Sequence, residues 1–286
     1  MVTGAAGQLG HHLAAALRKE DAICLTRADL DIASAAAVAA AIAEHRPDIV
    51  INAAAYTQVD AAEADEATAH VINADGPAHL AAALAEHGGR LIQVSTDYVF
   101  DGSATQPYEP DDQTGPQTAY GRTKLAGEVA ALATLPRRCT VVRTAWVYGG
   151  PGPNFVDTML RLEAERDFVD VVSDQIGSPT WVADLAGALV ELGATPVADP
   201  VLHYTNSGSG SWFDLARETF RLAGADPDRV RPTTADRFPR PAPRPAWSVL
   251  SPRRWLAAGL TKARPWQEAL ADLMATRRAA SRPETG

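Results

Sequence analysis

Short apolar runs alternate with longer alanine-rich amphipathic stretches over the first two thirds of this chain. The run Ile49-Val50-Ile51 is too short for a helix and is uniformly apolar, as expected of a strand that is buried on both faces. This alternation is typical of βαβ units, in which helices cover both faces of a parallel sheet, and it predicts a doubly wound α/β fold. The predicted strands cover 22–25, 49–52, 90–95, 140–143 and 202–206, and the predicted helices cover 8–19, 34–45, 78–87, 120–132, 182–192, 212–222 and 266–277.

The character of the sequence changes near Trp146. Glycines and prolines cluster at 149–153, and five more prolines fall within 231–245. Such segments are poor candidates for a regular helix or a central strand. We therefore predict a large domain over 1–146, joined by parts of 182–222 and by the last helix, and a smaller, loop-rich C-terminal lobe. The lobe is expected to comprise 147–181 and 223–250, and 278–286 to form a frayed tail.

Composition and charge restrict the class of protein. A formal net charge of -9 argues against non-specific binding of nucleic acid, which needs a basic surface. No apolar run is long enough for a membrane span, and no signal peptide is visible, so we expect a cytoplasmic protein. Its expected state is a monomer or homodimer. Cys24 and Cys139 lie in apolar runs and are expected to be buried free thiols. The histidines lack metal-ligand spacing, and we predict no metal site.

Three glycines, Gly4, Gly7 and Gly10, follow Val2-Thr3 and open the first predicted helix. Glycine at these positions allows a tight turn, a close approach to a pyrophosphate and close packing of helix on strand, and the helix N-terminus favours negative charge. The motif predicts a Rossmann-type dinucleotide site, the alternative being a tight turn that binds nothing. Only three residues precede Gly4, so we expect a very short first strand, which a late assigned start or a shortened chain would explain.

The choice of cofactor depends on the end of the second strand. NAD-selective Rossmann folds place an acidic residue there, whereas this chain has Arg27 after Leu25-Thr26. A guanidinium can pair with the 2′-phosphate of NADPH, although Arg27 could also be an ordinary surface arginine. The sequence favours NADPH, with NADH possible.

Tyr120 and Lys124 are spaced to lie on one face of a helix, one turn apart. Ketone reduction needs a proton donor, and an adjacent ammonium is expected to lower the pKa of the phenol from its usual value of about 10. The helix follows a strand that ends at Thr96, whose hydroxyl can contact the same carbonyl group. We predict that Tyr120, Lys124 and Thr96 are the catalytic residues of a reductase.

The spacing GxxGxxG is similar to that of the extended short-chain dehydrogenases/reductases. Within that superfamily the chain resembles the dTDP-4-dehydrorhamnose reductase family over nearly its whole length. The strings that carry the resemblance are LDI (30–32), PD (47–48), NAAAYT (52–57), VDAAE (59–63), STDYVFDG (95–102), YGRTKLAGE (120–128), RTAWVY (143–148), NF (154–155), DQIGSPT (174–180) and RPAPRPAWS (240–248).

The resemblance implies a role for each matching residue. Phosphate contacts would come from Gly7, Gln8 and Leu9, and adenine contacts from Asp31 and Ile32. The path to the nicotinamide would be lined by Ala54, Ala55 and Tyr56, while Tyr120 and Lys124 would also hold the cofactor. The substrate contacts would come from Thr96, Asp97, Trp146 and Asn154, although Trp146 could instead be a core residue and Asp97 a turn cap.

The expected reaction is NADPH-dependent reduction of the 4-keto group of dTDP-4-dehydro-6-deoxy-L-mannose to dTDP-L-rhamnose. The alternatives are a sister nucleotide-deoxysugar ketoreductase of secondary metabolism and a catalytically silent NADP-binding regulatory subunit. The chain departs from family members described as magnesium-bridged dimers, because it has His12 where those have a glutamate. Histidine is a poor ligand for a hard cation, so no metal-bridged dimer is expected.

Overall fold

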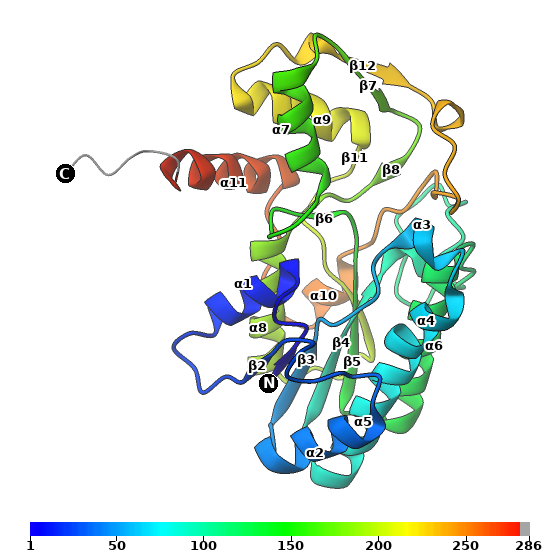
Figure 1. Cartoon of the computed structure of the whole chain (residues 1–286), viewed down its shortest axis with the longest axis vertical. Coiled ribbons are helices and arrows are strands. Elements are labelled where there is room, and N and C mark those ends of the chain that lie inside the picture. The colour runs from blue at the N-terminus through cyan, green and yellow to red at the C-terminus, as the bar shows by residue number, and fades with distance from the viewer. Residues whose placement is uncertain (281–286) are drawn as a thin grey trace, which may run out of the picture.

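A computed structural model describes residues 1–280, and its larger half is a sandwich of helices, sheet and helices (Figure 1). The central sheet has six parallel strands in the order β10-β5-β4-β3-β1-β2. Their bounds are β1 Val2–Thr3, β2 Cys24–Leu25, β3 Ile49–Asn52, β4 Arg90–Thr96, β5 Cys139–Thr144 and β10 Val201–His203. The chain reverses its direction of travel across the sheet between β1 and β3, where doubly wound folds bind ligands. The predicted Rossmann-type fold is confirmed.

Successive strand residues supply two separate hydrophobic cores, one on each face of the sheet. On one face α1 (Gln8–Ala16) and α8 (Val182–Ala194) cover a core that contains Ile51, Ile92 and Val142. On the other face the neighbouring residues Val50, Leu91 and Val141 pack under three helices, α2 Ala35–His45, α5 Gly76–His87 and α6 Ala119–Thr134. Burial on both faces explains why these strands are uniformly apolar in sequence.

Above the carboxyl ends of the strands lies a smaller body, here called the second lobe and defined as 155–177 and 210–245 (Figure 1). Its own core contains Met159, Val169, Phe220 and Val230. Its elements are α7 Phe155–Glu165, β7 Val169–Val172, β8 Ile176–Gly177, β11 Gly210–Ser211, α9 Trp212–Ala223, η3 Pro227–Arg229, β12 Val230–Thr233 and η4 Ala235–Arg237. The chain passes into the second lobe twice, because α8 and β10 return to the main sheet between the two segments.

The remaining elements pack beside these two bodies or join them. They are α3 Val59–Ala62, α4 Glu66–His70, the π-helix η1 Val71–Asp75, the 3₁₀-helix η2 Asp97–Val99, β6 Val147–Tyr148, β9 Thr180–Trp181, α10 Arg253–Ala257 and α11 Trp266–Ala280. The last helix, α11, packs against α9 and β9 rather than on the central sheet. It continues to Ala280, so 278–280, the start of the predicted tail, are helical; 281–286 lie outside the described residues. The predicted domain boundaries stay a prediction.

Several predicted elements differ from the observed ones. The helix α7 was not predicted, and the first helix ends at Ala16 instead of residue 19. The proline-rich segment contains a strand, β12, whose Pro232 pairs with Val171 of β7. The missing N–H of proline is tolerated there because the sheet has only two strands and both are edges. Cys139 is buried as predicted, but Cys24 is only partly buried because β2 is the edge of the sheet; both thiols are free. No helix within 1–280 is long and apolar enough to span a membrane.

Candidate active site

The glycine loop and the loop after β3 meet at the crevice between β1 and β3. Gly4 has a φ of +70°, and a Cβ atom added there would lie 2.6 Å from the backbone nitrogen of Ala54. A Cβ at Gly10 would lie 2.1 Å from the carbonyl oxygen of Gly4. The amide of Ala5 donates to the carbonyl of Leu25, so the end of β2, with exposed Arg27 two residues later, belongs to the same edge. The predicted cofactor residues on these loops are therefore brought together.

The start of α1 suits the phosphates of a dinucleotide. Gly7 is the N-cap and has no side chain to accept from the first N–H groups of the helix, which keep their partial positive charge. Oε1 of Gln8 is buried without a hydrogen-bond partner, while Nε2 of Gln8 donates to the carbonyl of Pro153 at 3.3 Å. Arg27 forms no salt bridge with any described residue. The phosphate loop and the unpaired guanidinium fit the phosphates of a dinucleotide, whereas the orphaned amide oxygen of Gln8 is an acceptor and needs a donor such as a hydroxyl.

Other predicted cofactor residues have structural partners. The side chain of Leu9 packs against the core, and Ile32 is buried beneath Gly76. The side chain of Ile32 is committed to packing, so a cofactor contact from Ile32 would use its backbone atoms, whereas Leu9 is only partly buried. Oδ1 of Asp31 accepts from the amide of Ala33 in the turn before α2.

A residue that the sequence reasoning missed, Asn73, fixes the position of Tyr56. Its Oδ1 accepts from the Tyr56 amide at 2.8 Å, and its Nδ2 donates to the Tyr56 carbonyl at 3.0 Å and to the Thr123 hydroxyl at 3.2 Å. Asn73 lies in the π-helix η1, and a Cβ at Gly127 of α6 would come within 2.0 Å of its carbonyl oxygen. Asn73 thus ties the Ala54–Tyr56 loop to the helix that carries Tyr120. Hydrophobic periodicity offers no signal for a π-turn, which is why this link was missed.

Local interactions fix the start of the catalytic helix α6. The hydroxyl of Thr118 accepts from the Gly121 amide at 3.0 Å, and Glu63 accepts from the Ala119 amide at 2.8 Å, so two otherwise unpaired N–H groups are satisfied. A Cβ at Gly121 would lie 2.2 Å from the carbonyl oxygen of Tyr98, so only glycine permits this approach. As a result the rings of Tyr98 and Tyr120 meet edge to face at 5.6 Å.

Thr96, Tyr120 and Lys124 converge beside the end of β4. The Thr96 hydroxyl lies beside Tyr120 and acts to lower the pKa of its phenol, and Lys124 donates from Nζ to the carbonyl of Val94 at 2.6 Å. Burial raises the pKa of Tyr120 to about 12, with Thr96 opposing the shift and Asp97 adding to it. Burial lowers the pKa of Lys124 to about 8, against the opposing effect of Glu128.

The expected direction of the Tyr120 shift was therefore wrong. We expected Lys124 to lower the pKa of the phenol, whereas the structure raises it, because desolvation of the phenolate dominates and the ammonium is directed to the Val94 carbonyl. A phenol with a raised pKa is fully protonated at neutral pH, which is the state that a proton donor requires.

Asp97 is buried next to these groups. Burial raises the pKa of its carboxyl to about 6, while the hydroxyls of Ser248 and Thr96 oppose the rise. Thr96 donates to Oδ1 of Asp97 at 3.0 Å. Asp97 is the first residue of η2, but its burial and its contact with Thr96 place it with the predicted catalytic residues rather than in a solvent-exposed turn.

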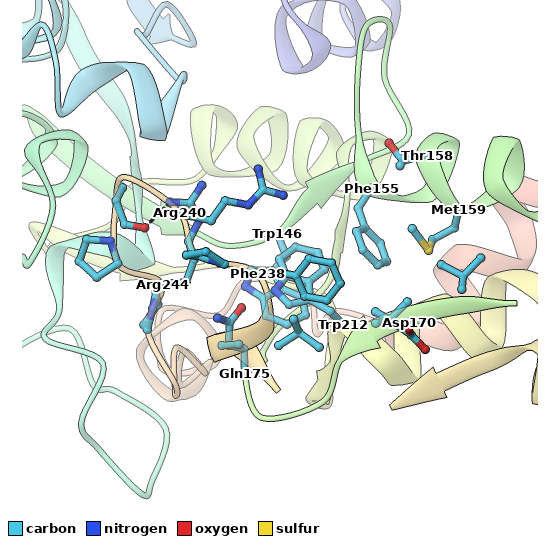
Figure 2. A pocket seen from close by; sticks show the side chains of 18 of the residues that line it. Trp146, Phe155, Thr158, Met159, Asp170, Gln175, Trp212, Phe238, Arg240 and Arg244 are labelled. Atoms are coloured by element: carbon cyan, nitrogen blue, oxygen red, sulfur yellow. Dashed lines mark hydrogen bonds between the residues drawn. The ribbon is translucent and has the colours of Figure 1, made fainter. Parts of the chain in front are cut away.

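A cavity of about 610 Å³ is lined mainly by the second lobe, together with Tyr98 and Trp146 (Figure 2). Tyr98, which contacts Tyr120, is part of its wall, and so is Trp146. Trp146 has a φ of +48° and stacks face to face on Trp212 at 3.5 Å, so a conformation rare for tryptophan holds it at the cavity. Trp212, which the sequence reasoning did not select, lines the same wall.

Asn154, a predicted substrate residue, is not brought to the cavity wall. Its Oδ1 accepts from the Asp157 amide at 3.1 Å and its Nδ2 donates to the Asp157 carboxylate at 2.6 Å. These bonds make Asn154 the N-cap of α7, whereas the next residue, Phe155, lines the cavity.

Within residues 1–280 no group of three or more His, Cys, Asp or Glu side chains is arranged to hold a metal ion. His12 lies on α1 near the Gly149 backbone, and burial lowers its pKa. Nothing at this position resembles an oxygen-rich cation site.

Comparison with known proteins agrees with this geometry. The family model of the RmlD substrate binding domain matches residues 1–279. The dTDP-4-dehydrorhamnose reductase of Mycobacterium tuberculosis is 54% identical over 96% of this chain and 92% of its own length. A probable dTDP-4,6-dihydroxy-2-methyloxan-3-one 4-ketoreductase of Streptomyces antibioticus is 51% identical over 100% of this chain and 97% of its own. The crystal structure of dTDP-4-dehydrorhamnose reductase from Bacillus anthracis in complex with NADP superposes with a TM-score of 0.92, at 38% identity, over 96% of this chain and 98% of that one.

Fold, site geometry and relatives over the full chain length agree, and the chain belongs to the dTDP-4-dehydrorhamnose reductase family, defined by the RmlD substrate binding domain.

Proposed function

We propose that this protein uses NADPH to reduce the 4-keto group of dTDP-4-dehydro-6-deoxy-L-mannose, yielding dTDP-L-rhamnose. The observation that carries the proposal is the convergence of Thr96, Tyr120 and Lys124 at the sheet edge, beside a cavity whose wall includes Tyr98. A relative that is 54% identical is named for this reaction, and a structural neighbour was crystallised with NADP.

Three residues of the chain have separate roles in the reaction. When bound, the nicotinamide cofactor supplies the hydride that reduces C4. Tyr120, protonated because burial raises its pKa to about 12, donates its proton to the C4 oxygen as negative charge develops there. Thr96, whose hydroxyl lies beside Tyr120, orients the same oxygen. Lys124, with a pKa near 8, keeps positive charge beside the tyrosinate that results.

The cofactor would bind at the edge of the sheet that is formed by the loops after β1, β2 and β3. Gly4, Gly7, Gln8 and Gly10 would hold the diphosphate at the start of α1, and Arg27 the 2′-phosphate of NADPH. Residues 1–146 would thus bind the cofactor, while 147–181 and 223–250 supply the substrate side. We place the enzyme in the cytoplasm as a monomer or homodimer.

A sister deoxysugar ketoreductase is the second candidate, since the 51%-identical relative from Streptomyces antibioticus is named for a different dTDP-linked keto sugar. The catalytic residues would be the same in both reactions, so the lining of the cavity would decide the sugar. A silent regulatory subunit has less support, because Thr96, Tyr120 and Lys124 are all present and brought together.

The test is NADPH oxidation with dTDP-4-dehydro-6-deoxy-L-mannose generated in situ, followed by identification of the product. Formation of dTDP-L-rhamnose supports the proposal, while turnover only with another dTDP-keto sugar favours the sister reductase. Tyr120→Phe should lower turnover at least about a hundredfold and leave NADPH binding intact. A Tyr120→Phe variant that retains most of its turnover would refute the role of Tyr120.

A further inference from the structure

Asp60 joins the Rossmann half to the proline-rich segment that forms part of the cavity wall. It lies in α3, and its carboxylate accepts from Nη1 and Nη2 of Arg244, both at 2.9 Å. It also accepts from the amide of Ala242 at 3.3 Å, and Nη1 of Arg240 lies 3.8 Å away. Two arginines that are four residues apart therefore share one carboxylate, 180 or more residues away in sequence.

Arg244 donates three hydrogen bonds within this junction. Besides its fork with Asp60, its Nη1 donates to the carbonyl of Ala242 at 2.9 Å, and the side chain is 23% exposed. The next residue, Pro245, lies so close to Gly102 that a Cβ at Gly102 would be 2.5 Å from it. Although partial burial of Asp60 opposes it, the contacts with Arg244 and Ala242 lower the pKa of its carboxyl, so Asp60 remains ionised at neutral pH. The segment 242–245 is thereby clamped in place.

Arg240 is held much less firmly than Arg244. Its side chain is 61% exposed, and the 3.8 Å approach to Asp60 is its one ion-pair contact among the described residues. It lines the cavity, and Figure 2 shows Arg240 and Arg244 at one end, away from Phe155 and Met159. A long, exposed ion pair of this kind contributes little stability, so separating it costs little.

The opposite end of the cavity has a different chemistry. Trp146 and Trp212 are stacked midway along the cavity, and Phe155 tilts against Trp212 at 4.7 Å on the side away from Arg240 (Figure 2). Met159 and Leu162 continue this apolar wall, which also includes Asp170. A ligand that matches both ends has a planar or apolar group at one end and an anion near Arg240. A nucleoside diphosphate meets this requirement.

We propose that Arg240 exchanges its contact with Asp60 for the diphosphate of the nucleotide-sugar substrate, while the Asp60–Arg244 fork keeps the segment in place. The inference rests on the proposed function for the identity of the nucleotide. Asp60 acts as a positioning residue, and Arg240 as a substrate-binding residue that changes partner on binding. The side-chain amide and carbonyl of Asn154 are both used in capping α7, so the structure points to Arg240 rather than Asn154 for the anion.

The experiment measures binding of dTDP and of thymidine to the full chain by calorimetry, so that it does not depend on turnover. Arg240→Gln should weaken dTDP binding roughly ten- to hundredfold, the loss expected when a charge-assisted contact is removed, and leave thymidine binding unchanged. Arg240→Lys should recover part of the loss, because it retains the charge but not the fork. Arg237→Gln is the matched control: Arg237 is exposed on the same segment but does not line the cavity, and its loss should leave dTDP affinity unchanged.

Equal dTDP affinity in the wild type and in Arg240→Gln would overturn the inference. A loss in Arg237→Gln as large as in Arg240→Gln would also overturn it, since the effect would then belong to the general charge of the segment. Failure of the wild type to bind dTDP would overturn it as well. Turnover of the keto sugar is measured separately and tests the proposed function alone. If the wild type turns over the keto sugar and the Arg240→Gln variant binds dTDP normally, the proposed function stands and this inference fails.

Discussion

Replacing Glu128 by glutamine should cost this protein far more stability than the same change at Glu66. Glu128 lies on α6, and its carboxylate accepts three hydrogen bonds from Arg143 of β5, at 3.0, 3.2 and 2.7 Å. The two side chains are 2% and 5% exposed. Glu66 makes the same kind of fork with Arg122 of α6, at 3.0 and 2.6 Å, but these side chains are 44% and 45% exposed.

The difference in burial sets the difference in cost. Glu128→Gln leaves the Arg143 guanidinium buried and without a counter-charge, and removing one partner of a buried pair costs about 3–5 kcal/mol. We expect Glu128→Gln to lower the free energy of unfolding by about 3 kcal/mol, at the low end of this range. Nη1 of Arg143 keeps its bond to the carbonyl of Pro110, and the new amide oxygen can still accept a hydrogen bond from Arg143. Glu66→Gln breaks an exposed pair and should cost less than about 1 kcal/mol.

Equilibrium unfolding in urea, monitored by circular dichroism, measures both values. The reasoning requires Glu128→Gln to lower the unfolding midpoint clearly and Glu66→Gln to leave it almost unchanged, with similar slopes for both transitions. Equal losses in the two variants, or a loss below about 1 kcal/mol for Glu128→Gln, would refute the argument from burial.

Two further predictions use the glycine loop and a buried histidine. Gly10→Ala places a Cβ 2.1 Å from the Gly4 carbonyl oxygen and should weaken NADPH binding roughly tenfold or more in a fluorescence titration. Gly187→Ala on α8, where the added Cβ meets nothing within 4 Å, is its control and should bind normally. Burial and the charge of Arg143 lower the pKa of His203 to about 3, so below 6.5 the unfolded chain binds a proton that the folded chain does not. Wild-type stability should therefore fall as the pH drops from 6.5 toward 3, and His203→Leu should lose less between pH about 7 and about 5; an identical loss would contradict this assignment.

Much of the Rossmann half could be predicted because its signals are local. The strand β3 has the predicted bounds, 49–52, and α2 begins one residue after the predicted start because Ser34 is its N-cap. These elements bury one face or both, and the resulting periodicity is visible in any short window of sequence. The second lobe was harder to predict. The helix α7 follows a glycine- and proline-rich loop, and β7 and β12 form a two-stranded sheet that leaves only a weak apolar pattern.

In the candidate site, too, features that depend on local sequence could be predicted, and those that depend on the complete fold could not. The spacing of Tyr120 and Lys124 on one helix face is a local property, and the structure brings both beside Thr96. The partner of Arg244 could not be found in this way, because Asp60 is 184 residues away and only the complete fold brings the two together. The sign of the Tyr120 pKa shift was missed because it depends on burial by surrounding residues rather than on the neighbouring ammonium.

The second lobe is built from two separate stretches of chain, and this constrains how such enzymes can exchange specificity. The cavity takes part of its wall from 155–172 and another part from 212–245, with α8 and β10 between them. A single crossover between two related genes within this intervening stretch would join half of one wall to half of another, including the stacked pair Trp146 and Trp212. Recombination preserves an intact cavity only when both segments are inherited together. New sugar specificities on this scaffold are therefore expected to arise by point substitution in the wall rather than by exchange of one contiguous segment.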